Sequence, residues 1–236
     1  MLPPVREGTV RVLIETLRLS RDRNRVQLAD IASGARATES FAREVLTDAL
    51  IEHDSNWISL SPRVRIRLAL DIARVGRLRD AARVLTWQEF EKFAEECLGE
   101  AGFQTEKNVR VQGGGRAWQI DVVGFRGDLV LTFDCKRWNT PGYLSRFKLA
   151  AKHQRIATRH LLNTLVDKAI QRDKEWQILP VILTLSEPPA QLSEDAVLVS
   201  VEKLPSFLSG VTPYDETLPF MASPLSFVEN PMSQSQ

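Results

Sequence analysis

Residues 118–138 read WQIDVVGFRGDLVLTFDCKRW, and they carry the strongest structural signal in the sequence. It contains two apolar runs, Ile120–Phe125 and Leu129–Phe133, which are joined by the short connection Arg126-Gly127-Asp128. Two apolar runs on either side of a tight glycine-containing turn predict a β-hairpin. We expect the rest of the chain to be organised around this hairpin.

Charged residues stand in this hairpin where apolar ones are expected. Asp121 lies inside the first run, and Asp134 and Lys136 end the second. Because strand side chains alternate between faces, Asp134 and Lys136 should point to one side and Cys135 to the other. The hairpin can bring Asp121 to the same edge, where an ionised group is costly unless it is paired or binds a metal. The pattern therefore predicts a cation site with an amine beside it.

The spacing of these residues resembles the signature of the PD-(D/E)xK nucleases. Asp121 is followed, after twelve intervening residues, by Asp134–Trp138, DCKRW. This ending is most similar to that of Mrr-type restriction endonucleases and archaeal Holliday-junction resolvases, although Ile120 stands where the family has a proline. The resemblance covers about residues 86–187 and implies a restriction-endonuclease-like core that cleaves phosphodiester bonds with Mg²⁺.

The resemblance also implies roles for individual residues. Asp121, Asp134, Glu91 and the main-chain carbonyl of Cys135 would hold Mg²⁺, with Mn²⁺ as an alternative ion. Lys136 would orient or deprotonate the attacking water, or stabilise the developing phosphorane. The catalytic residues implied are Glu91, Asp121, Asp134 and Lys136.

Glu91 falls in a helix that is expected over residues 86–101. Thr86 and Glu89 have the spacing of a capping box, and Gly102 should end the helix. The resemblance places an acidic ligand at the position of Glu91, with Glu95 one turn later as the alternative. The plain alternative is that both are surface glutamates.

The elements around the hairpin predict an α/β fold. We expect a strand over residues 105–111 after the helix, and a second long helix from 144 to about 174. Strands over 178–185 and 197–201 and a short helix over 204–208 follow. The resemblance arranges these as αβββαβ around a mixed central sheet, in a catalytic domain of residues 86–210.

The N-terminal region has helical periodicity. Residues 10–17 predict a first helix, residues 24–33 a second that ends at Gly34, and Thr38 should begin a third. In the third helix the buried stripe would be Phe41, Val45, Leu46, Ala49 and Leu50. With a short strand over 56–61, residues 1–61 resemble a winged helix-turn-helix domain. Residues 62–85 should form a helical connector, as one helix or as two broken at Gly76.

DNA is the partner that both parts imply. The third helix would read DNA, and arginine suits phosphate and base-edge contacts. The alternative is a winged helix used for protein contacts or dimerisation, which the acidic residues of that helix favour. The candidate DNA contacts are Arg36, Ser40, Arg43, Arg63, Arg65, Gln119, Lys152, Arg155 and Arg159.

Charge is distributed unevenly along the chain. The net charge of +1 argues nothing by itself, but residues 136–174 carry ten Lys and Arg against two acids. A basic block directly after the expected catalytic strand suits a polyanionic substrate. The alternative is a solvated helix face.

The composition is that of an ordinary soluble globular protein, and the cysteine content predicts a reducing cellular compartment. Two cysteines do not make a disulfide framework, and the longest apolar run, residues 178–185, is too short to span a bilayer. With no signal-peptide pattern, we expect a cytoplasmic, nucleoid-associated protein with no membrane partner. Residues 211–236 should form an extended C-terminal tail that packs on its own domain or on a protein partner.

These observations favour a metal-dependent DNA endonuclease of the restriction or repair type. The main alternative is a non-catalytic DNA-binding regulator that keeps a degenerate nuclease fold. Metal-independent cleavage of RNA is weaker, because no His/Tyr/Lys triad stands out. A two-fold symmetric homodimer is usual among nucleases that cut both strands. The sequence leaves open whether duplex, methylated duplex, junction, flap or single strand is cut.

Overall fold

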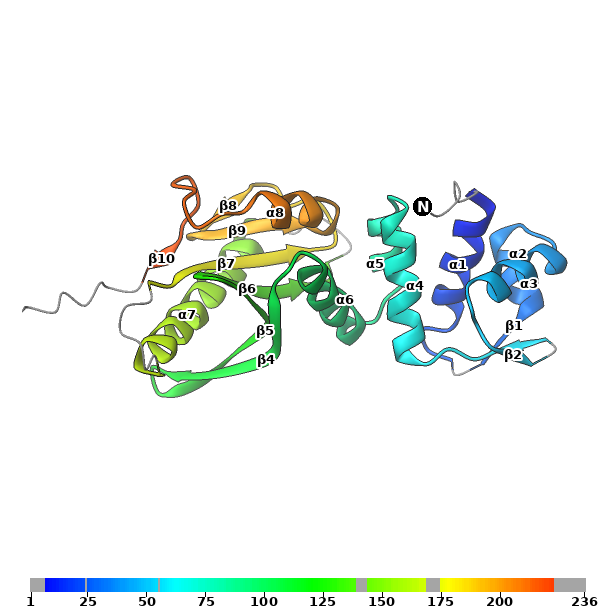
Figure 1. The fold of residues 1–236 in the computed structure, drawn as a ribbon, viewed down its shortest axis with the longest axis horizontal. Helices are drawn as coiled ribbons and strands as arrows, with labels where there is room; N and C mark the ends of the chain where they lie inside the picture. The colour runs from blue at the N-terminus through cyan, green and yellow to red at the C-terminus, as the bar shows by residue number, and fades with distance from the viewer. Residues whose placement is uncertain (1–6, 24, 55, 139–143, 169–174, 223–236) are drawn as a thin grey trace, which may run out of the picture.

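The structure is a computed structural model that describes residues 7–23, 25–54, 56–138, 144–168 and 175–222 of the 236-residue chain. The molecule is elongated, with a small helical part at one end and a mixed sheet with its helices at the other (Figure 1). Helices α4 (Pro62–Arg74) and α5 (Leu78–Arg83) stand between the two. Residues 7–61 are called the N-terminal part below, and residues 86–222 the sheet part.

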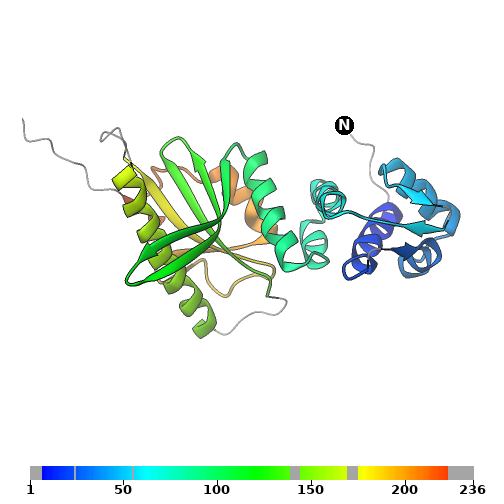
Figure 2. The ribbon, with the colours of Figure 1, turned by 90° about the horizontal axis from the view of Figure 1, so that it is seen from below.

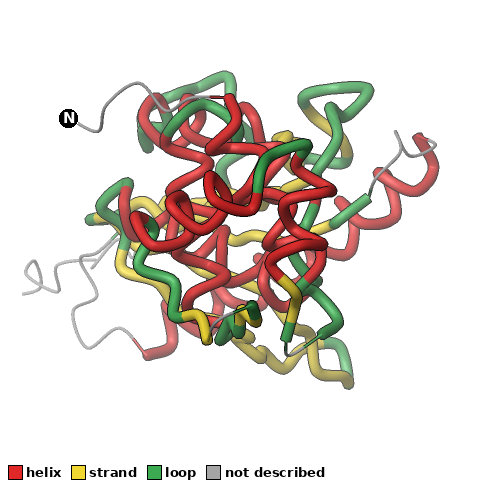
Figure 3. The backbone as a smooth tube through the Cα atoms, turned by 90° about the vertical axis from the view of Figure 1, so that its right-hand side faces the viewer, coloured by secondary structure: helices red, strands yellow, loops and turns green. Residues whose placement is uncertain are grey.

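The N-terminal part packs helices against a small sheet. Its elements in chain order are α1 (Glu7–Leu19), β1 (Val26–Gln27), α2 (Leu28–Ala35), α3 (Glu39–Asp48), β2 (His53–Asp54) and β3 (Trp57–Ile58). β3 is the middle strand, and Ile58 lies opposite Val26 of β1 and opposite His53 of β2, antiparallel in both cases. Seen from this end of the molecule, the helices lie in front of the large sheet (Figure 3).

The second helix differs from its prediction at both ends. α2 begins at Leu28, because the expected first turn instead contributes β1. Its left-handed residue is Arg36, with φ of 53°, and Gly34 lies inside the helix. A Cβ at Gly34 would lie 2.0 Å from the Glu15 carboxylate oxygen of α1. Gly34 therefore serves helix packing and not helix termination.

The third helix begins as predicted and ends earlier. The Thr38 hydroxyl accepts a hydrogen bond from the backbone N–H of Phe41 at 3.2 Å. α3 ends at Asp48, and Leu50 has φ of 53° and is 76% exposed. The expectation that Leu50 belongs to the buried stripe is wrong, because α3 ends two residues before it. Arg36 precedes α3 and is not one of its outward positions.

The connector is two helices, the second of the predicted alternatives. Gly76 lies between α4 and α5 with φ of 82°, a conformation that suits glycine. The Ser61 hydroxyl caps α4 by accepting from the N–H of Val64 at 3.3 Å. The apolar core runs without a break from the N-terminal part through α4 and α5 into the sheet part.

The sheet part begins with helix α6 (Trp87–Glu100). The predicted capping box of Thr86 and Glu89 is present, and Gly102 follows the helix with φ of 83°. The elements after it are β4 (Gln104–Gly113), β5 (Arg116–Arg126), β6 (Leu129–Lys136), α7 (Leu144–Lys168), β7 (Gln177–Thr184), β8 (Leu192–Ser193), β9 (Ala196–Ser200), a 3₁₀ turn (Val201–Lys203), α8 (Leu204–Gly210) and β10 (Met221–Ala222).

Among the described residues of the sheet part, the strands form one mixed sheet in the order β4-β5-β6-β7-β9-β8, with β10 paired to β7. β4, β5 and β6 are antiparallel, and β6, β7 and β9 are parallel, with Asp134 opposite Ile182. A parallel pair requires a crossover, which α7 provides. The chain order α6, β4, β5, β6, α7, β7 is the predicted αβββαβ order, and this mixed α/β architecture is compatible with a restriction-endonuclease-like fold.

Helices cover both faces of the sheet. Phe90 and Leu98 of α6 and Leu204 of α8 share one core cluster with inward residues of β6 and β7. Ala157 and Leu161 of α7 belong to a second cluster on the other face. Figure 2 shows the long β4–β5 hairpin reaching across α7.

The described part of the C-terminal tail packs on its own domain. Met221 of β10 pairs antiparallel with Ile178 at the start of β7. The protein partner expected for the tail concerns mainly residues 223–236, which lie outside the described residues, as does the expected end of α7 over 169–174. Across the described ranges, we find no helix with the length and apolar character that crossing a membrane requires.

Candidate active site

The candidate site begins at an irregular point of the β4–β5 pairing. The two strands pair on both sides of Asn108 and Asp121, but these two residues do not pair with each other. Asn108 has φ of 52°, and its side-chain oxygen accepts a hydrogen bond from Gln119 Nε2 at 3.1 Å. The interruption frees Asp121 from a regular strand pair and lets its side chain turn towards β6.

Asp121 is tied to the neighbouring strand by its carboxylate. Its Oδ2 atom accepts a hydrogen bond from the backbone N–H of Cys135 at 2.8 Å. The side chain of Cys135 is buried in the large core cluster, on the side away from its two neighbours as predicted. The predicted reach of Asp121 to the end of β6 is thus present.

Asp134 and Lys136 form an ion pair at the end of β6. Lys136 Nζ lies 2.6 Å from Asp134 Oδ1. Asp134 is 8% exposed, whereas the Lys136 side chain is one-third exposed. The amine is therefore within reach of a ligand from solvent while it balances the charge of a buried carboxylate.

Glu91 supplies a third buried carboxylate from α6. It is 5% exposed, and its Oε1 atom has no hydrogen-bond partner among the described residues. Glu95, the alternative, pairs instead with Lys92 at 2.9 Å and with Lys107 at 3.5 Å. The geometry therefore favours Glu91 over Glu95 as the acidic group of the site.

The charges of these groups shift one another's pKa values. Burial, followed by the charges of Asp134 and Glu91, raises the pKa of Asp121 to about 7, against the opposing effects of the Cys135 N–H and Lys136. Burial also raises the pKa of Glu91; Lys107 opposes this, Asp134 adds to it, and Lys136 opposes it. Buried carboxylates that destabilise one another's charge are stabilised by a cation.

The donor set fits a hard divalent cation that keeps other ligands. No group of three or more His, Cys, Asp or Glu residues within the described ranges is arranged to hold a metal by itself. Mg²⁺ is usually bound by one or two protein carboxylates together with waters and substrate phosphates. The unpartnered oxygen of Glu91 and the raised pKa of Asp121 fit such an ion.

An aromatic and basic cluster borders the site and was not predicted. The Arg116 guanidinium lies 3.5 Å from the Trp118 ring centroid, and the His153 ring lies 4.8 Å from it. Burial lowers the pKa of His153; Asp134 opposes this shift, and Arg116 and Lys136 add to it. The sequence signal was the alternation of Arg116 and Trp118 before the hairpin, which places both on one side of β5.

The expected DNA contacts of the sheet part differ in availability. Gln119, Lys152 and Arg159 are exposed. Arg155 is half-buried and pairs with Asp195 at 2.8 Å. Gln154 of α7 is buried and donates to the Thr132 carbonyl at 2.9 Å. Gln119, Lys152 and Arg159 are therefore the more accessible candidates.

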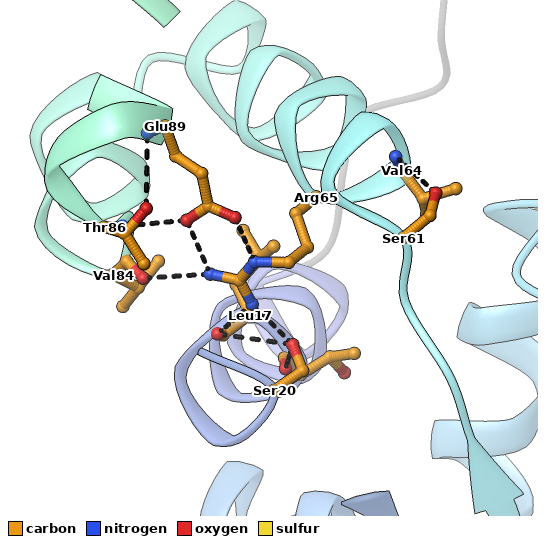
Figure 4. A network of polar contacts seen from close by, with 9 residues as sticks. Leu17, Ser20, Ser61, Val64, Arg65, Val84, Thr86 and Glu89 are labelled. Carbon is orange, nitrogen blue, oxygen red and sulfur yellow. Dashed lines mark hydrogen bonds and ion pairs between the residues drawn. The ribbon is translucent and has the colours of Figure 1, made fainter. Parts of the chain in front are cut away.

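In the N-terminal part and connector, one expected contact is wrong. Arg36, Ser40 and Arg63 are exposed, and Arg43 is half-buried with a hydrogen bond to the Asn56 side chain at 3.2 Å. Arg65, expected at the surface near the wing, is only 3% exposed. It lies on the inward face of α4 and is paired with Glu89 of α6 (Figure 4), so it cannot contact DNA.

Comparison with known families covers the segment that carries these carboxylates. Residues 82–166 match the family model Mrr_cat, described as a restriction endonuclease. The match supports the PD-(D/E)xK nuclease superfamily and indicates a nuclease. The segment contains Glu91, Asp121, Asp134 and Lys136.

Solved structures are similar over part of their length. A protein of unknown function, AF1548, has 22% identity and a TM-score of 0.34, covering 47% of this chain and 55% of that one. Protein VC1899 from Vibrio cholerae has 14% identity and a TM-score of 0.36, covering 86% of this chain and 49% of that one. The chain thus spans about half the length of each. Among curated proteins none matches it.

Proposed function

We propose that the protein is a metal-dependent DNA endonuclease of the restriction or DNA-repair type. The observation that carries the proposal is the meeting of buried Glu91, Asp121 and Asp134 with Lys136 inside the segment that matches a restriction endonuclease model. A phosphodiester resists attack because its anionic oxygens repel a nucleophile. A site that combines cation ligands with an amine can neutralise this negative charge and so lower the barrier to attack.

The carboxylates would hold the cation. Asp121, Asp134, Glu91 and the main-chain carbonyl of Cys135 would bind Mg²⁺, or Mn²⁺ in its place. When bound, the ion supplies positive charge that neutralises the phosphodiester and acidifies water. The hydrogen bond from the Cys135 N–H fixes the Asp121 carboxylate, so this ligand needs little reorganisation on binding.

Lys136 would act on the nucleophile or on the phosphate. Its ammonium is held beside Asp134 and is partly open to solvent. From this place it can orient the attacking water, accept its proton once neutral, or donate to the oxygens of the developing phosphorane. Each role needs the amine at the site, which the ion pair with Asp134 supports.

The N-terminal part would be a winged helix that binds DNA. The order α1, β1, α2, α3, β2, β3 and the antiparallel pairing of β3 support this proposal. α3 would enter the major groove. Exposed Arg36, Ser40 and Arg63, together with Arg43 beside the β2–β3 turn, would contact DNA there. Protein contact or dimerisation through the same surface is the alternative.

A second candidate is a DNA-binding regulator without catalysis. It is favoured by the absence of a ready three-ligand metal group within the described residues and by the Lys136–Asp134 ion pair, which already neutralises one carboxylate. In that case the winged helix would carry the function. Together with nuclease activity, we propose that the protein forms a homodimer and is located in the cytoplasm with the nucleoid.

The test is cleavage of a labelled panel of duplex, methylated duplex, single strand, flap and four-way junction, with and without Mg²⁺ or Mn²⁺. Asp134→Ala removes a proposed ligand, and Glu106→Ala removes an exposed carboxylate of β4 as the matched control. We expect cleavage that requires the metal, is lost in Asp134→Ala and is kept in Glu106→Ala. DNA binding should persist in all three proteins. Cleavage by Asp134→Ala contradicts the assigned site, and tight binding without cleavage by the unaltered protein favours the regulator.

A further inference from the structure

Arg65 on α4 is the centre of a buried network that joins α1, α4 and α6 (Figure 4). Its Nε and Nη2 atoms donate to the two carboxylate oxygens of Glu89 at 2.5 and 3.1 Å. Nη1 donates to the Leu17 carbonyl and to the Ser20 hydroxyl, both at 2.6 Å, and Nη2 donates to the Val84 carbonyl at 3.2 Å. These bonds use every N–H donor of the guanidinium group.

Glu89 connects the Arg65 network to the first turn of α6. Its Oε2 atom also accepts from the backbone N–H of Thr86 at 2.7 Å, and the Thr86 hydroxyl accepts from the Glu89 N–H at 3.2 Å. The carboxylate that Arg65 binds is therefore the one that closes the capping box. The first turn of α6 is fixed relative to α1 and α4 by one side chain.

Glu91 follows Glu89 by two residues on the same helix. Its buried Oε1 atom has no hydrogen-bond partner within the described chain, so the backbone of α6, and not a side-chain contact to this atom, sets its place. A helix moves as a unit over one or two turns. A shift at Glu89 therefore displaces the Glu91 carboxylate.

Resting on the proposed metal-dependent cleavage, we propose that Arg65 is a positioning residue for Glu91. It acts through Glu89 and the first turns of α6 and does not touch DNA or the ion. Lysine cannot replace it, because an ammonium has three donors and no planar fork that matches a carboxylate. Arg65→Lys should keep the positive charge and most of the packing. It should lose the paired hydrogen bonds to the two carboxylate oxygens of Glu89.

A second ion pair between the same two helices provides the control. Arg74 of α4 binds Glu100 of α6 at 2.5 Å, and both side chains are about half exposed. Glu100 ends α6, far along the helix from Glu91. Arg74→Lys therefore perturbs the same helix pair with the same chemical change, away from the site.

Three measurements on the full chain test the proposal. Hydrogen exchange of the metal-free protein should become faster over residues 87–92 in Arg65→Lys and stay unchanged there in Arg74→Lys. Mn²⁺ affinity by calorimetry should fall about 10- to 100-fold in Arg65→Lys only, which is typical of residues that orient metal ligands. In cleavage, Arg65→Lys should lower kcat by a similar factor and leave KM for DNA unchanged, because the DNA-contacting surface is intact.

The outcomes separate this proposal from the proposed function. Unchanged Mn²⁺ affinity and kcat in Arg65→Lys, with an active unaltered protein, overturn the positioning role and leave the nuclease intact. Equal losses in Arg65→Lys and Arg74→Lys also overturn it, because they indicate general loosening of the helix pair. An unaltered protein that neither binds Mn²⁺ nor cuts any DNA overturns the nuclease proposal and the positioning role with it.

Discussion

Asp121 of β5 accepts a hydrogen bond from the backbone N–H of Cys135 of β6, with 2.8 Å between Oδ2 and the nitrogen. The donor belongs to the main chain, so the carboxylate keeps its place whatever the neighbouring Lys136 does. This bond alone would lower the pKa of Asp121. Burial, together with Asp134 and Glu91, outweighs it and raises the pKa to about 7. The charged form of Asp121 is therefore destabilised by the fold in the absence of a cation.

Asp121→Asn should stabilise the metal-free protein at neutral and higher pH. The folded pKa of about 7 lies above the usual aspartate value of about 3.9, so the contribution of Asp121 to the free energy of unfolding is most favourable below the unfolded pKa. It loses that stability as pH rises through the folded pKa, by an amount on the order of a few kcal/mol. The amide avoids this loss and can still accept from Cys135. Chemical denaturation from about pH 4 to pH 8 measures the difference.

Metal ions should make the unaltered protein more stable than Asp121→Asn. Mg²⁺ or Mn²⁺ should raise the melting temperature of the unaltered protein and leave that of Asp121→Asn unchanged, because a ligand stabilises the state that it binds. Glu106→Gln, on the surface of β4, serves as the control and should respond like the unaltered protein. An equal metal-induced shift in Asp121→Asn would show that the ion binds elsewhere.

Arg65→Ala should cost far more stability than Arg74→Ala. The first change leaves the Glu89 carboxylate buried without its partner, which typically costs about 3–5 kcal/mol. The second breaks an exposed pair, which is worth about 1 kcal/mol or less. Equilibrium unfolding in urea at neutral pH measures both, and equal losses would contradict the assigned burial of Arg65.

The Arg65–Glu89 pair should also contribute to acid sensitivity. Burial alone would raise the pKa of Glu89, but hydrogen bonds from Arg65 and Thr86 outweigh it and the pKa is lowered. The stability that this group contributes is therefore present above its unfolded pKa and is lost as pH falls through the folded one. Glu89→Gln should flatten the acid limb of the stability curve. A curve that keeps its full slope would assign the acid loss to other carboxylates.

Gly34→Ala and Gly99→Ala should have opposite effects. A Cβ at Gly34 meets the Glu15 carboxylate, which is itself bound by Arg18, so we expect a loss of about 1–3 kcal/mol. Among the described residues outside its own helix backbone, no atom lies within 4 Å of a Cβ at Gly99 in α6, so alanine should gain up to about 1 kcal/mol there. Thermal unfolding of both variants checks the pair, and a neutral Gly34→Ala would mean that α1 and α2 separate easily.

Arg36→Asn should weaken DNA binding without changing kcat. Asparagine tolerates the left-handed backbone at this position, so the substitution removes charge with little strain. If Arg36 contacts one phosphate, the slope of log affinity against log salt should fall by about 1. Arg74→Gln is the control, because Asp71 and Glu100 already balance that charge. An unchanged slope in Arg36→Asn would favour the protein-contact alternative for the N-terminal part.

The hairpin and its carboxylates could be predicted because their signals are local. Apolar runs, a glycine turn and alternation define β5 and β6, and the spacing from Asp121 to Asp134 is read directly from the sequence. The helix that carries Glu91 could be predicted for the same reason, since its capping box and its terminal glycine lie within one element.

Features that depend on contacts between distant segments could not be predicted. Arg65 looks like any arginine of a basic stretch, and only the approach of α1 and α6 makes it a buried network centre. Gly34 looks like a helix terminator, but its role is set by Glu15 on another helix. The cluster of Arg116, Trp118 and His153 likewise needs α7 to lie against β5.

The β5–β6 hairpin has a consequence for the order of events during synthesis. Its two strands are joined by a turn of a few residues, and hairpins of this kind close within about 1–10 μs. The Asp121–Cys135 bond spans only fourteen positions and can form with the hairpin, whereas β6 finds β7 only after the whole α7 crossover has been made. Early pairing would bring the Asp121 and Asp134 side chains together on a nascent chain before α7 has been made, at a stage when water still weakens their repulsion. The repulsion between these carboxylates would then become strong only later, when the docked helices exclude water from the site.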